Sequence, residues 1–291
     1  MKLKNIFIVS AITLLLVFCA MLYVFFIRNR ISTVEPEIST VAMGILTSDD
    51  KVIAQYQAFA DYLNKYSGVQ WYVVPVKDAG SFIEQIENHK IKSAFVGSAV
   101  GYRIIKNNLG FPVARGEQNG ISTYDAYVIA KKDSGIESIE DLRNKRFAYV
   151  DINMTSGYLF PAYLLRSLGH DPDIFFRASS FLKTTSNVVD AVISGNFDGG
   201  AVKSLDLLAL IEKDPGIQDK INVIEKGGSY PNNTFMLSVD LDDQTAAKIQ
   251  NLLLTMNNSE EGRLVLENMD IDRFIKTSNS DFREVEKIMN F

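Results

Sequence analysis

The chain has 291 residues, of which 47% are hydrophobic and 22% charged, so it is long enough for one or two globular domains. Its formal net charge of -5 argues against a nucleic-acid-binding protein, because such proteins normally present a basic face. The single cysteine, Cys19, excludes an internal disulfide. Because the net charge is negative, any anion that the chain binds must be held by hydrogen-bond donors close to it.

Residues 1–30 are predicted to be a membrane anchor or signal. The apolar run 5–27 is long enough to span a bilayer and longer than the usual core of a signal peptide. We expect an uncleaved single-pass anchor, with a cleaved signal and lipidation at Cys19 as alternatives. The residues 16–19 are similar to a lipobox, but Phe18 stands where a small residue is needed. Basic residues flank both ends of the run, so the charge pattern does not decide its orientation.

Residues 31–40 are polar and contain a proline, which indicates a tether. After it, three apolar segments with β-branched or aromatic residues alternate with two segments of helical period. The predicted strands are 41–46, 69–76 and 93–97, and the predicted helices are 52–66 and 81–88. This order predicts a mostly parallel sheet flanked by helices, with ligands bound at the carboxyl ends of the strands. Those ends are polar and include Ser48, Gly97 and Ser98.

A second α/β unit is predicted further along the chain. The strand 124–130 is expected to cross from one lobe to the other, and 235–239 to cross back. Between them lie the predicted elements 139–142, 145–150, 186–194, 195–201 and 221–225, and a helix 243–255 follows. We therefore expect an α/β fold with lobe 1 at 41–127, lobe 2 at 128–232, and a return to lobe 1 with C-terminal helices at 233–291.

The segment that follows strand 147–150 has the composition of an anion site. Thr155, Ser156 and Gly157 stand where a strand turns into a helix, and a helix start leaves free backbone N–H groups with a partial positive charge. Threonine and serine are also ordinary helix-capping residues. Pro161 leaves the start of the helix open: it kinks a helix that begins at Ser156, but fits the first turn of one that begins near Phe160.

Three sequence runs resemble the phosphate, phosphite and phosphonate-binding proteins of ABC transporters. They are T-S-G-Y-L-F-P, S-L-G-H-D-P and D-A-V-I-S-G-N-F-D-G-G-A, and the resemblance covers about residues 41–274. It implies a type 2 periplasmic-binding fold with two lobes, outside the cytoplasm. In this family a similar S-T-S-G segment holds the ligand's oxygens, which implies that Thr155, Ser156 and Gly157 bind the ligand.

The resemblance implies further ligand-binding residues. Gly97 and Ser98 match a segment that faces the ligand from the first lobe, and Tyr124 matches a tyrosine that closes over the ligand or packs at the hinge. Thr185 stands where family members often place a histidine on the anion. Leu205 and Asn233 stand where some members hold a ligand amine with acidic residues, so the resemblance disfavours a ligand amine.

The sequence contains none of the common catalytic or phosphate-cradling motifs, and it predicts no catalytic residue, cofactor or metal. We therefore expect a membrane-anchored, extracytoplasmic solute-binding protein. It captures phosphate, phosphite or a phosphonate between its lobes and presents the closed form to an ABC permease. The alternative is a ligand sensor that signals through its anchor or to a partner kinase. A hydrolase or synthase on the same scaffold needs a catalytic residue that the sequence does not offer.

Overall fold

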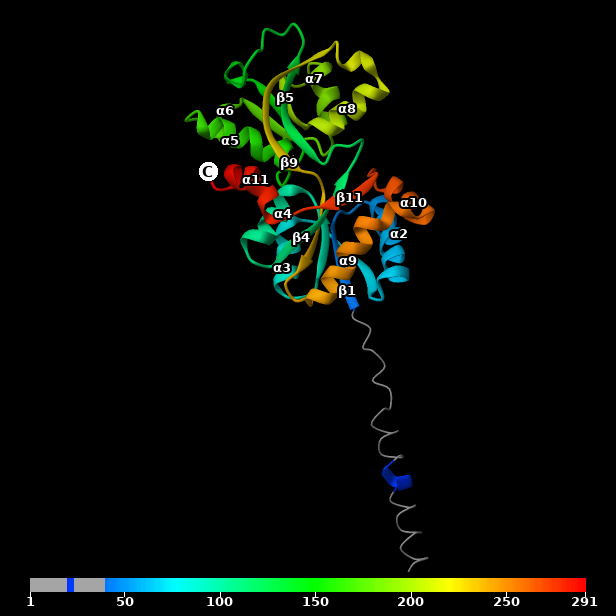
Figure 1. Cartoon of the computed structure of the whole chain (residues 1–291). Helices are drawn as coiled ribbons and strands as arrows, with labels where there is room; N and C mark the ends of the chain where they lie inside the picture. The colour runs from blue at the N-terminus through cyan, green and yellow to red at the C-terminus, as the bar shows by residue number, and fades with distance from the viewer. Residues whose placement is uncertain (1–19, 24–39) are drawn as a thin grey trace, which may run out of the picture. The chain divides into compact units, whose positions relative to one another are not determined.

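The computed structural model describes residues 20–23 and 40–291 (Figure 1). Thr40–Phe291 forms one compact unit. The predicted anchor at 5–27 lies outside the described residues except for 20–23, which are helical. Within the described ranges, no helix has both the length and the apolar character needed to cross a membrane.

The first lobe is built on a six-stranded sheet with the order β11-β4-β10-β3-β1-β2. The parallel pairing expected among the first three strands is confirmed, because β1 lies between β2 and β3 and runs parallel to both. The sheet is mixed, since β10 and β11 run antiparallel to their neighbours. The strands are β1 (Thr40–Leu46), β2 (Gln70–Val76), β3 (Ser93–Val96), β4 (Gly110–Glu117), β10 (Thr234–Ser238) and β11 (Arg273–Lys276).

Helices cover this sheet, and polar side chains mark where several of them begin. Asp49 caps α2 by accepting a hydrogen bond from the Lys51 amide, and Gly68 ends the helix with a positive φ of 71°. Asp78 caps α3 in the same way through the Ser81 amide. The helices are α2 (Asp50–Ser67), α3 (Ala79–Glu87), α4 (Ser98–Lys106), α9 (Asp243–Thr255), α10 (Glu260–Asn268) and α11 (Arg283–Met289).

The second lobe is built on a five-stranded sheet with the order β7-β6-β8-β5-β9. Only β5 runs against the other strands, since β6 is parallel to both β7 and β8 while β5 is antiparallel to β8 and β9. The strands are β5 (Thr123–Lys131), β6 (Arg146–Tyr149), β7 (Ala178–Phe181), β8 (Gly199–Lys203) and β9 (Ile221–Pro231), and the helices are α5 (Phe160–Ser167), α6 (Pro172–Phe175), α7 (Thr185–Ile193) and α8 (Ser204–Lys213).

Two chain crossings join the lobes. The chain passes from β4 in the first sheet to β5 in the second, and from β9 in the second sheet back to β10 in the first. The second crossing falls between Pro231 and Thr234, next to the boundary expected at 232/233. The first falls earlier than the boundary expected at 127/128, because Thr123 already pairs with Pro231 in the second sheet.

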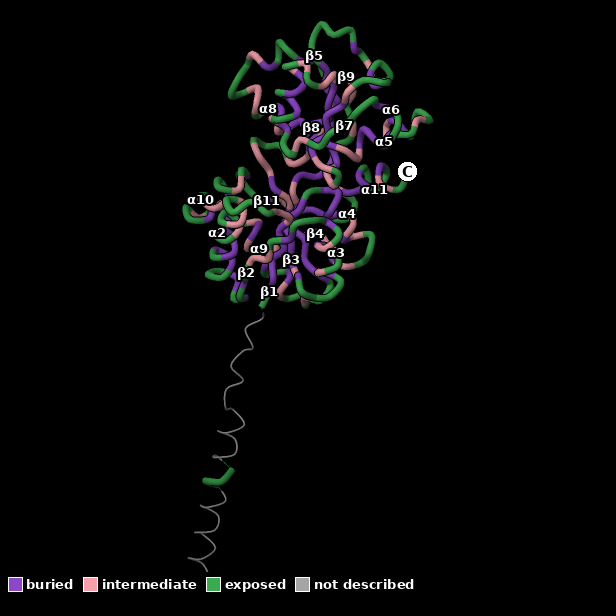
Figure 2. The backbone as a smooth tube through the Cα atoms, turned by 180° about the vertical axis from the view of Figure 1, so that it is seen from behind, coloured by how far each residue is buried: buried purple, intermediate pink, exposed green. Residues whose placement is uncertain are grey.

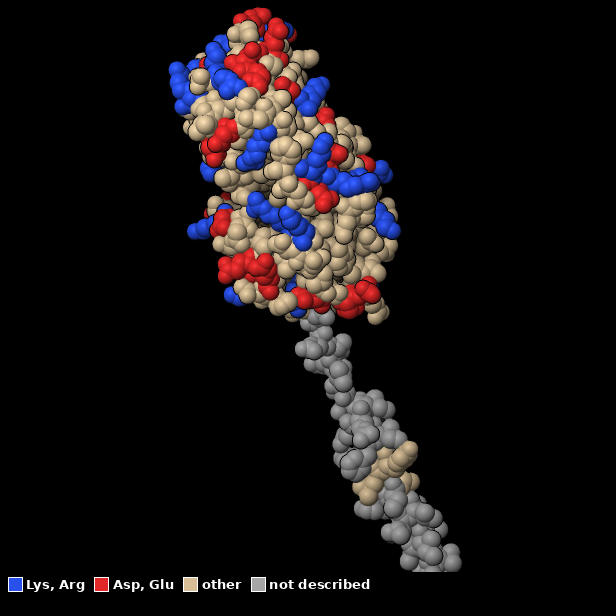
Figure 3. All heavy atoms as spheres, turned by 90° about the vertical axis from the view of Figure 1, so that its left-hand side faces the viewer, with Lys and Arg blue, Asp and Glu red and all other residues tan. Residues whose placement is uncertain are grey.

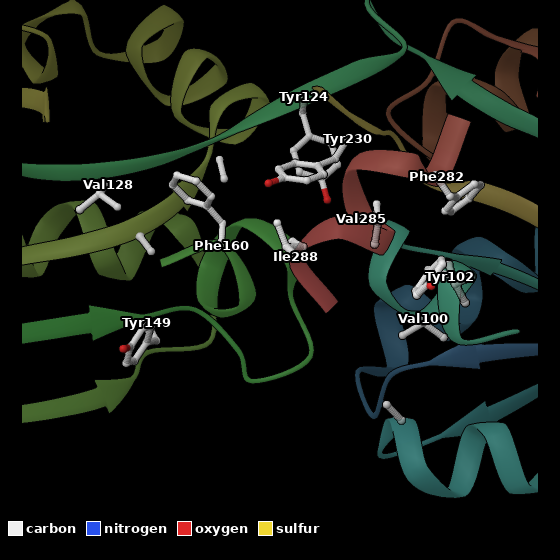
Figure 4. Packing of buried hydrophobic residues seen from close by; sticks show 14 of the residues in the cluster. Val100, Tyr102, Tyr124, Val128, Tyr149, Phe160, Tyr230, Phe282, Val285 and Ile288 are labelled. Atoms are coloured by element: carbon white, nitrogen blue, oxygen red, sulfur yellow. The ribbon is translucent and has the colours of Figure 1, made fainter. Parts of the chain in front are cut away.

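The lobes share an apolar cluster around the C-terminal helix. Buried residues from both lobes pack together there, and the rings of Tyr124 and Tyr230 lie 5.7 Å apart (Figure 4). Helix α11 touches α4 of the first lobe and α5 of the second. The residues after α11 contact both lobes. The side-chain amide of Asn290 donates to Tyr102 Oη at 3.0 Å, and the ring centroids of Phe291 and Tyr163 lie 5.1 Å apart. Burial is concentrated on inner strands such as β3 and β8 (Figure 2), whereas all four residues of the edge strand β7 are exposed.

An ion pair between Arg146 and Asp198 joins two neighbouring strands of the second sheet. The Arg146 guanidinium donates to both oxygens of Asp198, at 2.9 Å and 3.2 Å, and the Arg146 amide donates to the same carboxylate at 2.8 Å. These bonds join the start of β6 to the turn before β8. They keep the pKa of the Asp198 carboxyl below its usual value.

Replacing Asp198 with asparagine is expected to lower the free energy of unfolding by about 1 to 3 kcal/mol at neutral pH, because a hydrogen-bonded charge is lost. A depressed folded-state pKa contributes stability above the unfolded-state pKa of about 4, and that stability is lost as the pH falls through the folded-state pKa. Urea unfolding between pH 7 and pH 3 should therefore show a smaller acid loss in Asp198→Asn than in the wild type. Asp219→Asn, at an exposed site, is the matched control; equal effects of the two changes would contradict the prediction.

Candidate functional site

A cavity of about 350 Å³ is lined by residues from both lobes. Its walls combine strand ends, the start of α4 and the segment before α5. The lining residues are Leu46, Gly97, Ser98, Ala99, Val100, Tyr124, Asp151, Asn153, Met154, Thr155, Lys203, Asp206 and Asn233. A second cavity of about 180 Å³ shares Leu46, Gly97, Val100 and Asn233 with it and reaches Tyr56 and Phe95.

Three hydroxyl groups from different parts of the chain meet on the wall of the larger cavity. Ser98 Oγ lies 2.6 Å from Tyr124 Oη and 2.7 Å from Thr155 Oγ1. Ser98 opens α4 in the first lobe, whereas Thr155 belongs to the second, so this contact crosses between the lobes. Burial raises the pKa of Tyr124, and the two hydroxyl neighbours oppose that shift only in part. Tyr124 therefore remains a neutral donor and acceptor at physiological pH.

The sequence left open whether the helix with Pro161 begins at Ser156 or near Phe160. In the structure a short π-helical turn precedes the helix. This turn, η2 (Thr155–Leu159), leads directly into α5, which begins at Phe160 with Pro161 in its first turn. Gly157 allows η2 to press against the end of β6, because a Cβ there would lie 2.7 Å from Val150 Cβ. The Val150 amide donates to the Gly157 carbonyl at 3.2 Å. The turn is thus held against the sheet with Thr155 facing the cavity.

A positive charge stands in the cavity at the end of β8. The ammonium of Lys203 donates to Asn232 Oδ1 at 2.8 Å and lies 4.7 Å from the centroid of the Tyr124 ring. Burial lowers the pKa of Lys203, and the nearby charge of Asp206 opposes that shift. Among the described residues that line this cavity, Lys203 is the only lysine or arginine.

Two carboxylates share the same wall. Asp206 lies in the first turn of α8 and accepts a hydrogen bond from Thr185 Oγ1 at 3.0 Å through Oδ2. Asp151 follows β6, and its Oδ1 accepts from the Asn153 amide at 2.9 Å. The cavity therefore combines one ammonium, two carboxylates and several neutral donors.

The structure brings four of the eight sequence-predicted residues onto the cavity wall: Gly97, Ser98, Tyr124 and Thr155. Ser156 and Gly157 are buried behind Thr155, and the Ser156 hydroxyl has no hydrogen-bond partner in the described chain. Thr185 does not line the cavity but reaches it through Asp206. Ser48 is exposed and lines neither of these two cavities.

Sequence reasoning missed Lys203 and Asp206. The run G-G-A-V-K-S-L-D did contain a signal, because a lysine at the end of a buried strand stands where ligands bind in α/β sheets. The sequence has Leu205 and Asn233 where some family members place acidic residues, and Asp206 was not singled out. Asp206, next to Leu205, faces the cavity together with Asn233.

Comparison with known proteins places this architecture among solved binding proteins. The binding-protein component of an ABC phosphonate transporter from Pseudomonas aeruginosa has a TM-score of 0.71 and 21% identity, over 87% of this chain and 86% of that one. A Prochlorococcus marinus protein solved with methylphosphonate has a TM-score of 0.71 and 17% identity, over 87% of this chain and 98% of that one. At these identities the likeness shows the fold alone, a two-lobed α/β architecture.

The family follows from the sequence comparison. Residues 43–282 match the model of the periplasmic substrate-binding proteins of phosphonate ABC transporters, and the chain belongs to this family. A similar curated protein is a probable ABC transporter phosphite-binding protein from Prochlorococcus marinus. It is 21% identical over 221 residues, which are 67% of this chain and 74% of that protein.

Proposed function

We propose that this protein captures a phosphorus oxyanion, most favourably a phosphonate, in the cavity between its lobes and delivers it to an ABC permease. The observation that carries this proposal is the meeting of the Ser98, Tyr124 and Thr155 hydroxyls with the Lys203 ammonium in one cavity. Hydroxyl and ammonium donors are the groups that bind tetrahedral oxyanions. Membership of the family supports the ligand class and the link to uptake.

A phosphonate suits the two-part shape of the site. Its oxygens face the hydroxyls and Lys203, while its carbon substituent lies toward Leu46 and Val100. The adjoining cavity beside Tyr56 and Phe95 gives room for a longer substituent. The apolar part of this wall favours a phosphonate over inorganic phosphate, since burial of carbon is favourable.

Lobe closure is part of the proposed mechanism. The Ser98–Thr155 hydrogen bond links the lobes across the cavity. Each hydroxyl has one hydrogen to donate, so a bound oxyanion that accepts from both replaces this direct bond and itself bridges the two lobes. The ligand and the Ser98–Thr155 contact thus use the same hydroxyl donors. The ligand stabilises the closed arrangement of the lobes that a permease recognises.

The first test is thermal unfolding of the full chain with phosphate, phosphite, methylphosphonate, sulfate and a few amino acids. A ligand present at about 100 times its dissociation constant adds roughly 2.7 kcal/mol of stability. Methylphosphonate is expected to give the largest rise in melting temperature. If no phosphorus oxyanion raises it, the proposed function is wrong.

The double change Thr155→Ala with Ser156→Ala is expected to weaken methylphosphonate binding at least tenfold, because it removes the Thr155 hydroxyl from the cavity wall. Isothermal titration checks the affinity, and urea unfolding checks that the variant still folds. Ser48→Ala is the control, since Ser48 is exposed outside the cavity. Unchanged affinity in a folded double variant would remove Thr155 from the site.

We further propose that residues 5–27 anchor the binding domain at the outer side of the membrane, where it meets the permease. The apolar length of this run supports the proposal. The test is fractionation of the native protein: recovery with membranes after a high-salt wash supports anchoring, and recovery in the soluble fraction contradicts it.

A further inference from the structure

The charges that line the cavity do not balance for a fully ionised phosphonate. Lys203 supplies one positive charge, while Asp206 and Asp151 supply two negative charges. Tyr124 is the remaining titratable group on the wall, and burial keeps its hydroxyl neutral. A dianion here would meet two carboxylates with a single ammonium to offset them, and like charges at close range in a partly buried site repel strongly.

We propose that the cavity takes the phosphorus oxyanion in its singly protonated form, and that the Asp206 carboxylate accepts the hydrogen bond from the ligand's P–O–H group. This inference rests on the proposed function and adds a selection rule to it. It assigns Asp206 as the residue that distinguishes a protonated phosphorus oxyanion from an oxyanion that carries no proton, such as a sulfonate.

The surroundings of Asp206 leave one oxygen available for this role. Oδ2 accepts from Thr185, whereas Oδ1 receives no hydrogen bond from any described residue. An ionised carboxylate offers about four acceptor positions and no donor, so it can meet an anionic ligand favourably only through a proton on that ligand. The Thr185 bond also fixes the orientation of the carboxylate from α7.

A ligand ammonium could also donate a hydrogen bond to the Asp206 carboxylate. The charge of Lys203 argues against this alternative. The charge of Asp206 already acts on Lys203 and opposes the fall in its pKa. A second cation beside Asp206 would meet the Lys203 ammonium within the same cavity. A neutral P–O–H donor brings no such repulsion.

The groups that face Asp206 and the ligand determine the expected pH dependence. They are Lys203 on β8, Tyr124 on β5, Asp151 after β6 and the uncharged Thr185 on α7. As the pH rises through the second ionisation of methylphosphonate, its proton is lost and its affinity is expected to fall at least tenfold. Methanesulfonate does not titrate in this range, so a fall in its affinity reports a change of charge in the protein and not in the ligand.

The experiment is isothermal titration of the full chain with methylphosphonate and methanesulfonate across this pH range. At the acidic end, the wild type is expected to bind methylphosphonate at least tenfold more tightly than methanesulfonate. Asp206→Asn is expected to reduce that preference to about threefold or less, because an amide can donate to either ligand. Asp190→Asn, an exposed change on α7, is the control and should keep the preference.

The outcomes separate the inference from the function on which it rests. If the wild type binds no oxyanion at any pH, the proposed function fails and the inference with it. If it binds methylphosphonate more tightly as the second proton leaves, or if folded Asp206→Asn keeps the full preference, the inference alone is overturned. If Asp206→Asn does not fold, the pH dependence of methylphosphonate binding by the wild type tests the inference by itself.

Discussion

Replacing Lys203 with methionine is expected to weaken methylphosphonate binding by about 10- to 100-fold, because a charge-assisted hydrogen bond contributes about 1.5 to 3 kcal/mol. In the part of the chain that the structure describes, Lys203 is the only cationic side chain on the cavity wall, and methionine keeps most of its length and apolar stem. Isothermal titration measures the loss. Stability should change little or rise slightly, since burial already disfavours the Lys203 ammonium.

The chain offers a matched control for this change. Lys226 also places its ammonium over a tyrosine of β5, 5.3 Å from the centroid of Tyr127, but it does not line the cavity. Lys226→Met should therefore leave the affinity within about twofold of the wild type, because it touches neither ligand nor cavity. A similar loss of binding in both variants would show a general charge effect and would remove Lys203 from the site.

Replacing Gly227 with alanine is expected to lower the free energy of unfolding by about 3 kcal/mol or more. This is the upper end of the range for substitutions that add atoms to a packed core. A Cβ at this position would overlap the ring of Phe160, which is buried at the first position of α5. Because η2 leads directly into Phe160, displacement of that ring also moves Thr155 away from the cavity. Urea unfolding measures the stability, and isothermal titration measures the accompanying loss of binding.

A double-mutant cycle tests the proposed cause. If the clash with Phe160 is responsible, Gly227→Ala combined with Phe160→Ala should cost clearly less than the sum of the two single changes. Gly80→Ala is the single-site control, since its nearest neighbour is the flexible side chain of Asp78 at 3.2 Å. Additive costs in the cycle would show that the strain at Gly227 has another origin.

The local pattern was sufficient for the first βαβαβ unit. The strands at 41–46 and 69–76 are confirmed as β1 and β2, because continuous β-branched and aromatic runs bounded by polar turns permit little else. Strands β4, β7 and β11 were not predicted. β4 carries Pro112 and two glycines, and β7 is the four-residue run A-S-S-F, so neither has the composition of a typical strand. Pairing with neighbours distant in sequence creates these strands.

The π-helical turn before α5 illustrates the limit of local reasoning. The sequence left two starts open for this helix, because Pro161 is compatible with either. The choice was made by packing: Gly157 lies against Val150 at the end of β6, and Phe160 fills the space over Gly227 on β9. These contacts join residues up to 67 positions apart (227 − 160), so no local pattern reports them.

The sequence by itself determined the class of protein, the two-lobed α/β plan and the hydroxyl-bearing segment at Thr155. The α/β elements follow from hydrophobic periodicity, whereas the class of protein and the two lobes follow from the resemblance of three short runs to a known family. Only the tertiary structure decided which polar groups share the cavity. Ser98 follows β3, Thr155 follows β6, and Lys203 and Asp206 lie at the end of β8, and the order and direction of the strands in two sheets bring these three strand ends together. The charge of the site, and with it the protonation state of the ligand that we propose, is therefore a property of the fold.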